Sequence, residues 1–119
     1  MINKSKVSAF RITKPEAQVL VDVHSGFGQP IDTIVSVNGD KKIQEFGNLE
    51  AKPIDSGAAL KNQQIVVHVM CQDKNTSTDN LDVAIKVYEE GGTSVSMNYK
   101  GEASEEGEML VMDLTLFCI

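Results

Sequence analysis

Apolar and polar residues alternate along most of the chain, most regularly in two stretches, 64–72 and 81–88. In each stretch, apolar side chains at every second position share one face. These rows are Ile65, Val67, Val69 and Cys71 in the first stretch, and Leu81, Val83, Ile85 and Val87 in the second. A period of two residues is typical of strands with one face against a core. We therefore expect the two stretches to pair as a hairpin around the polar loop 73–80, at the centre of the fold.

The same pattern, interrupted by turn residues, predicts further strands on both sides of this pair. They cover 6–13 (with a fault near Ala9), 17–24, 31–37, 40–46, 93–100 and 108–119. Asn38 and Gly39 favour a tight hairpin turn, because both central residues of a type I′ turn take positive φ. Pro53 and Gly57 interrupt residues 47–62, so we expect a mostly irregular crossover there. A helical turn at 56–60 or a short edge strand are the alternatives.

About eight strands with regular turn signals and no helix of ordinary length indicate an all-β fold. We predict one domain over residues 1–119, an antiparallel β-sandwich of immunoglobulin-like or jelly-roll-like type, with a small barrel as the alternative. The segment 108–119 is apolar on both faces. It is therefore expected either in the middle of a sheet or under a partner.

Charge is unevenly distributed around a net value of −6. Residues 1–14 contain four basic residues and no acidic one, whereas residues 101–119 contain five acidic residues and no basic one. These are either two solvated clusters or ends that attract each other, within one molecule or between copies. The acidic balance repels phosphate, and with no Trp the chain offers little surface for stacking bases. We therefore expect no nucleic-acid partner.

Nothing in the sequence resembles a targeting or membrane-spanning segment. The first residues carry charges without a following apolar run, and no stretch approaches the ~20 apolar residues of a transmembrane helix. A cytoplasmic protein is the default expectation, and a secreted domain whose leader has been removed fits equally well. Cys71 and Cys118 lie in apolar runs, where free cysteine behaves as a small hydrophobe. They pair only if their strands are neighbours.

If successive strands alternate in direction, the loops divide between two ends of the sandwich. One end then gathers loops 13–16, 38–40, 73–80 and 101–107, and the other gathers 25–30, 47–62 and 89–92. The first group is rich in carboxylates. Oxygen ligands from several loops at one end of a sandwich are one way to build a calcium site, since Ca²⁺ takes six to eight hard oxygens.

The candidate calcium ligands are Asp73, Asn75, Asp79 and Asp82. Their spacing is similar to the start of a helix–loop–helix calcium loop. The similarity then ends, because Thr78 stands where that loop needs Gly and Ala84 where it needs a bidentate Glu. A polar hairpin loop that satisfies its own backbone is the alternative interpretation. Calcium is the one cofactor that the sequence suggests, and no other is expected.

The sequence contains no recognisable catalytic motif. There is no Gly-x-Ser-x-Gly sequence, and Cys118 lies in a strand rather than on a turn. His24, with Asp22 two residues away, and His68 lie on the polar faces of their strands, without a third metal ligand nearby. We predict that the protein is not an enzyme, with a small enzyme whose site is unrecognised as a remaining alternative.

Binding or assembly is the function that the surface pattern favours. Isolated apolar residues stand on the outward faces of several strands: Leu20, Ile34, Val66, Met70 and Tyr88. On one sheet they would form a patch for a partner. The leading hypothesis is a non-enzymatic protein-interaction or assembly module that pairs with itself or another protein, including by strand addition. A calcium-dependent ligand- or membrane-binding sandwich is the alternative. The sequence identifies no small-molecule ligand.

Overall fold

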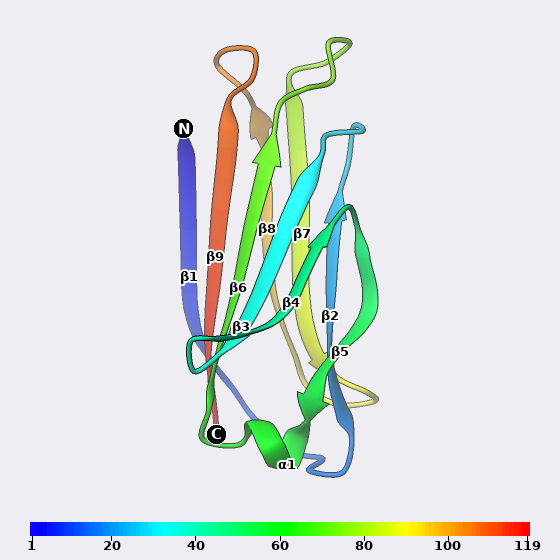
Figure 1. The fold of residues 1–119 in the computed structure, drawn as a ribbon, viewed down its shortest axis with the longest axis vertical. Coiled ribbons are helices and arrows are strands. Elements are labelled where there is room, and N and C mark those ends of the chain that lie inside the picture. The colour runs from blue at the N-terminus through cyan, green and yellow to red at the C-terminus, as the bar shows by residue number, and fades with distance from the viewer.

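The computed structural model describes residues 1–119 as two β-sheets stacked face to face (Figure 1). The elements in chain order are β1 (Ile2–Phe10), β2 (Gln18–Ser25), β3 (Ile31–Val37), β4 (Asp40–Phe46), β5 (Leu49–Ser56), the helical turn α1 (Gly57–Leu60), β6 (Gln64–Gln72), β7 (Asn80–Glu89), β8 (Ser94–Glu102) and β9 (Met109–Cys118). One sheet has the order β1-β9-β6-β3-β4 and the other β5-β2-β7-β8. The predicted sandwich is confirmed, and the barrel alternative is wrong, because no strand pairing joins the two sheets.

All neighbouring strands in the two sheets are antiparallel except for one pair. β1 runs parallel to β9, with Ile2 opposite Leu110 and Phe10 opposite Cys118. This pairing places the basic first strand beside the acidic last segment, and the terminal ammonium of Met1 lies 3.3 Å from Glu108 Oε2. The opposite charges of the two ends therefore meet within one molecule. β9 lies between β1 and β6, which confirms the expectation that the last segment is internal to a sheet.

The core lies between the sheets and is lined by alternate residues of β2, β3, β6, β7 and β9, with single buried residues from the edge strands β1, β4 and β8. Both predicted apolar rows, on β6 and on β7, are completely or almost completely buried. The predicted hairpin between them is wrong, since β6 pairs with β3 and β9 whereas β7 pairs with β2 and β8. A period of two identifies the residues that face a core. The same period arises when two strands face one core from opposite sheets of a sandwich, as β6 and β7 do. The loop that joins β6 to β7 therefore crosses from one sheet to the other.

The segment expected to be irregular contains an edge strand and a single helical turn. β5 pairs with β2 alone, through two register shifts, and its edge position tolerates Pro53. Ser56 then begins α1 by accepting a hydrogen bond from the Ala59 amide at 3.2 Å. Leu49 and Leu60 anchor the two elements in the core, each 1% exposed.

Because β5 is a strand, every later strand runs opposite to the direction expected from the sequence. The predicted grouping of loops is therefore wrong in part: 73–80 shares an end with 101–107 as expected, but not with 13–16 and 38–40. Loops 73–80 and 101–107 lie at one end together with loop 25–30, whereas loops 13–16 and 38–40 lie at the other end with α1 and the C-terminus (Figure 1). Hydrogen bonds join the first group, from the Gly107 amide to the Asp73 carbonyl and from the Ala103 amide to the Asp79 carbonyl.

Candidate functional site

The outer face of the four-stranded sheet is an ordinary solvated surface. On β5, Pro53 lies opposite the outward Leu20. The outward side chains of the other three strands are Gln18, Leu20, Asp22 and His24 of β2, Asp82, Ala84, Lys86 and Tyr88 of β7, and Ser94, Ser96, Asn98 and Lys100 of β8. Opposite charges face each other across the strands, with Asp22 in register with Lys86, and Lys100 Nζ 4.0 Å from Asp82. Such a face needs no partner to cover it.

The outer face of the five-stranded sheet is different, because it carries more apolar side chains and three of the most exposed ones. We call this surface the docking face and define it by its outward residues: Asn3, Ser5, Val7 and Ala9 of β1; Met109, Val111, Asp113, Thr115 and Phe117 of β9; Gln64, Val66, His68, Met70 and Gln72 of β6; Asp32, Ile34 and Ser36 of β3; and Lys41, Gln44 and Phe46 of β4. Six large apolar side chains of the protein are exposed. Three of them, Val7, Phe46 and Phe117, lie on this face, while Met1 and Ile119 are the chain ends and Phe27 is in a loop.

Charged groups on the docking face are few and partly paired. His68 and Asp113 face each other across β6 and β9, with His68 Nδ1 2.6 Å from Asp113 Oδ1. Lys41 lies at one corner and donates to Gln44 Oε1 at 2.7 Å. Asp32, on β3, is different, because its Oδ1 is buried and has no hydrogen-bond partner.

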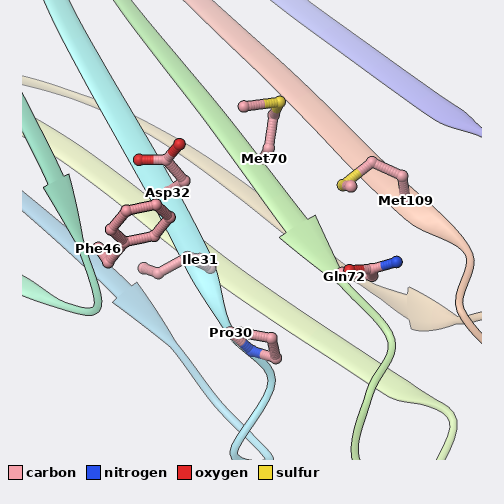
Figure 2. Close-up of a pocket in the computed structure, with 7 residues that line it drawn as sticks. All are labelled: Pro30, Ile31, Asp32, Phe46, Met70, Gln72 and Met109. Carbon is pink, nitrogen blue, oxygen red and sulfur yellow. The ribbon is translucent and has the colours of Figure 1, made fainter.

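A pocket of about 220 Å³ opens on this face around Asp32. Its lining residues are Pro30, Ile31, Asp32, Phe46, Met70, Gln72 and Met109 (Figure 2). Phe46 and Met70 stand directly opposite Asp32 on the two neighbouring strands. The pocket is therefore mostly apolar, with one unpaired carboxylate oxygen at its wall.

The apolar residues predicted to face outward are divided between the two sheets. Ile34, Val66 and Met70 belong to the docking face. Leu20 and Tyr88 lie opposite each other on the other sheet, where Leu20 is only 8% exposed. The single patch predicted from all five residues is therefore wrong, and three of the five contribute to the patch that exists.

Both open sides of the sandwich are bridged by side chains. At the β1 and β8 edges, Lys6 Nζ donates to the Ser96 carbonyl at 2.8 Å, and the Lys4 ammonium lies 5.8 Å from the centre of the Tyr99 ring. At the β4 and β5 edges, Lys52 forms an ion pair with Glu45. Charged side chains along edges oppose pairing with another strand.

The four calcium candidates occupy different environments at the loop end. Asp73 is 2% exposed, and its Oδ1 accepts a hydrogen bond from Gln29 Nε2 at 2.9 Å while its Oδ2 has no partner. Asn75 donates to the Phe27 carbonyl, Asp79 is exposed, and Asp82 lies beside Lys100. No three His, Cys, Asp or Glu side chains come together in a metal-binding arrangement. Calcium binding at this loop stays a prediction.

Gln29 organises the loop that carries these residues, and sequence reasoning missed it. The side chain is 3% exposed. Its Oε1 accepts hydrogen bonds from the Lys74 and Asn75 amides, both at 2.8 Å, and its Nε2 also donates to the Asn80 carbonyl at 3.2 Å. A glutamine between Gly28 and Pro30 gives no local signal of burial. Its role follows from the loop that folds over it.

Glu89 is a second buried polar residue that the sequence did not reveal. It accepts hydrogen bonds from the amides of Thr13, Lys14 and Thr93 and from both threonine hydroxyls, at 2.7–3.1 Å. Burial by itself raises the pKa of Glu89, but these hydrogen bonds outweigh it and lower the pKa to about 2. A Cβ on Gly92 would lie 2.6 Å from Glu89 Oε1, so the turn requires glycine there. With its oxygens engaged, Glu89 ties two loops together and is unsuited to act as a base.

The histidines and cysteines do not form a catalytic group. His24 is exposed on the four-stranded sheet, whereas His68 lies on the docking face and contacts Asp113 rather than Asp22. Neither histidine lines the pocket. Cys71 and Cys118 are buried and unpaired, at opposite ends of the five-stranded sheet. Burial raises the pKa of both thiols, that of Cys118 to about 11.

Comparison of the chain with protein-family models, curated proteins and solved structures finds no match in any of the three. The structure contains no helix with the length and apolar character needed to span a lipid bilayer.

Proposed function

We propose that this protein is an assembly module whose docking face binds a second copy of the same chain. The observation that carries the proposal is the contrast between the two outer faces. Three of the six exposed large apolar side chains lie on the docking face, and none lies on the other sheet, whose outer surface carries cross-strand opposite charges. A concentration of exposed apolar side chains on one face of a folded domain is typical of an interaction surface.

The size of the docking face suits a dimer. Five strands spaced ~4.8 Å apart and about nine residues long, at ~3.3 Å per residue, give a face of roughly 700 Å². Stable protein–protein interfaces bury about 800 Å² on each partner. Two such faces in contact therefore approach the area that a specific dimer requires.

The charge distribution allows two copies to approach, although each carries a net charge of −6. On the docking face Asp113 is beside His68, and the remaining charged groups are one carboxylate, Asp32, and one ammonium group, Lys41. The strongly acidic segment 101–107 lies at the loop end, away from the centre of this face. Repulsion between copies is therefore weakest where the apolar surface is largest, and ionic strength screens the rest.

Sedimentation equilibrium and light scattering after size exclusion test the proposal. The concentration range runs from about 1 μM to about 1 mM, where a modest dimer dissociates. Val66→Lys introduces a charge in the middle of the docking face. Ala84→Lys is the matched control, since Ala84 is an equally half-buried outward residue on a central strand of the other sheet.

We expect a dimer that Val66→Lys weakens by about 100-fold or more and that Ala84→Lys leaves within about threefold of the wild type. Far-ultraviolet circular dichroism of both variants establishes that they are folded. A wild-type chain that stays monomeric at the highest concentration overturns the proposal. Equal weakening by both variants would also overturn it, because the interface would then not be the docking face.

A further inference from the structure

The pocket on the docking face lacks a positive charge. Asp32 contributes a carboxylate oxygen that is buried and unpaired, and the other lining residues supply no cation (Figure 2). A buried carboxylate oxygen without a partner costs several kcal/mol of desolvation unless a donor reaches it. The natural occupant is an ammonium group on an apolar stem, because the stem can pack on Phe46, Met70 and Met109 while the charge meets Asp32.

Strand pairing arranges the docking face in rows that run across the strands. One row contains, from β4 to β1, Phe46, Asp32, Met70, Val111 and Asn3. The next row contains, in the same order, Gln44, Ile34, His68, Asp113 and Ser5. The third row contains Lys41, Ser36, Val66, Thr115 and Val7. The row of His68 is therefore the middle row, with the row of Asp32 on one side and the row of Lys41 on the other.

Two identical faces can stack about either of two simple two-fold axes that lie between them. An axis parallel to the strands keeps each row opposite itself and exchanges β3 with β9. It places Asp32 against Val111 and Ile34 against Asp113, so two carboxylates meet apolar side chains. Asp113 keeps His68 as its partner, but Asp32 would be buried against Val111 without one, which is strongly unfavourable.

An axis perpendicular to the strands keeps each strand opposite itself and exchanges the outer rows. The row of Asp32 then faces the row of Lys41 from the second copy. Met70 faces Val66, and Phe46 faces Lys41, where a lysine ammonium over an aromatic ring is itself favourable. The remaining contacts are mixed, since Val111 faces Thr115 and the middle row faces itself, which places each Asp113, beside its own His68, near the Asp113 of the second copy. What distinguishes this arrangement is that it brings the one lysine of the docking face toward the unpaired Asp32.

We propose that the docking face pairs about the axis perpendicular to the strands, and that Lys41 of each copy enters the other's pocket and binds Asp32. The inference rests on the proposed function, since it names the arrangement of the dimer and the group that fills its pocket. Symmetry gives two such lysine–aspartate pairs per dimer. Lys41 is exposed and held only by Gln44, so it is free to turn toward a partner.

A charge-swap experiment tests the pairing. Asp32→Lys makes both members of the proposed pair positive, and Lys41→Asp makes both members negative. Each chain alone should dimerise about 100-fold more weakly than the wild type, because both of its intermolecular pairs become repulsive. An equimolar mixture of the two chains should form a heterodimer of near wild-type affinity, since both pairs are attractive again. The double variant should regain self-association in the same way.

Lys61→Asp is the matched control, because Lys61 is an exposed lysine that follows α1, outside the docking face. It should leave the dimer within about threefold of the wild type, the range of a change far from the contact. Circular dichroism and melting temperature establish that each chain is folded. If a charge reversal unfolds the chain, the neutral variants Asp32→Asn and Lys41→Gln replace it. Each should weaken the dimer about tenfold and reduce its sensitivity to salt.

The outcomes separate this inference from the proposed function. A wild-type dimer whose affinity is insensitive to both single changes overturns the lysine–aspartate pairing and leaves the docking face intact. Folded single variants that are weakened but do not combine into a heterodimer also overturn the pairing. A monomeric wild-type chain overturns both. Recovery in the mixture and in the double variant, with Lys61→Asp unchanged, establishes the pairing.

Discussion

Replacing Glu89 with Gln tests how a buried carboxylate holds two loops of the sandwich together. The side chain is 1% exposed and accepts five hydrogen bonds, three from backbone amides and two from threonine hydroxyls. Glutamine has nearly the same shape but carries no charge. Its amide nitrogen also presents hydrogens to donors that need an acceptor. The substitution therefore removes the negative charge that accepts these hydrogen bonds and leaves the volume of the side chain nearly unchanged.

The magnitude follows from the pKa. Folding lowers the pKa of Glu89 from an ordinary value of 4.5 to about 2. At ~1.4 kcal/mol per pH unit, the ionised group contributes roughly 3 kcal/mol to the free energy of unfolding at neutral pH. We expect Glu89→Gln to lower that free energy by about this amount, equivalent to about 10 °C in melting temperature for a domain of this length.

The pH dependence gives a sharper test than the size of the loss. Because the pKa of Glu89 is lowered in the folded state, its contribution is complete above pH 4.5 and is lost as the pH falls toward about 2. The difference between wild type and Glu89→Gln should therefore shrink by about 1.4 kcal/mol per pH unit over this interval. At pH near 2 the two proteins should have almost equal stability.

Urea unfolding followed by circular dichroism at several pH values measures these differences, and the absence of Trp makes circular dichroism the simpler signal. Glu90→Gln is the matched control, since the neighbouring Glu90 side chain is exposed and should change stability by less than about 0.5 kcal/mol. A loss below about 1 kcal/mol for Glu89→Gln at neutral pH would refute the reasoning. A loss that is independent of pH would refute it as well.

Two further predictions concern the other buried polar groups. Gln29→Ala should lower the free energy of unfolding by about 2 kcal/mol, because Asp73 and two loop amides lose their partners, and hydrogen exchange should quicken in residues 73–80 more than in the core strands. Cys71 and Cys118 should react with a thiol reagent at least about 100-fold more slowly in the native protein than in urea, since burial raises the pKa of both thiols and excludes the reagent. Rapid native labelling of either cysteine would contradict its placement in the core.

The sequence was a good guide to strands and a poor guide to their neighbours. Alternation along residues 64–72 identified the buried face of β6 completely, because the two faces of a strand differ by one residue whatever the sheet. The same alternation said nothing about whether β6 pairs with β7 or faces it across the core. For residues 47–62 the sequence favoured an irregular crossover and gave a short edge strand or a helical turn only as alternatives, and both of these are present as β5 and α1. The sequence did not favour β5 because a strand with Pro53 and weak alternation is tolerated only at a sheet edge, and the edge position is not visible in the sequence.

Missing that one strand also reversed the predicted direction of every strand after it. Loop 73–80 was therefore grouped with loops that lie at the far end of the molecule. The composition of the candidate site was also only partly predictable from the sequence. Ile34, Val66 and Met70 were recognised as outward, but only the strand order shows that they share a face with Phe46 and Phe117.

By itself the sequence determined an all-β fold of sandwich type, the residues of its core rows and the Asn38-Gly39 turn, and it left open whether the oppositely charged chain ends attract each other. Each of these follows from local periodicity, turn chemistry or composition, which act over a few residues or over the whole chain. The tertiary structure alone decided the strand order, the buried roles of Gln29 and Glu89, and the pocket around Asp32 on an apolar face. These depend on which distant segments become neighbours, and that is set by packing between two sheets rather than by any segment on its own.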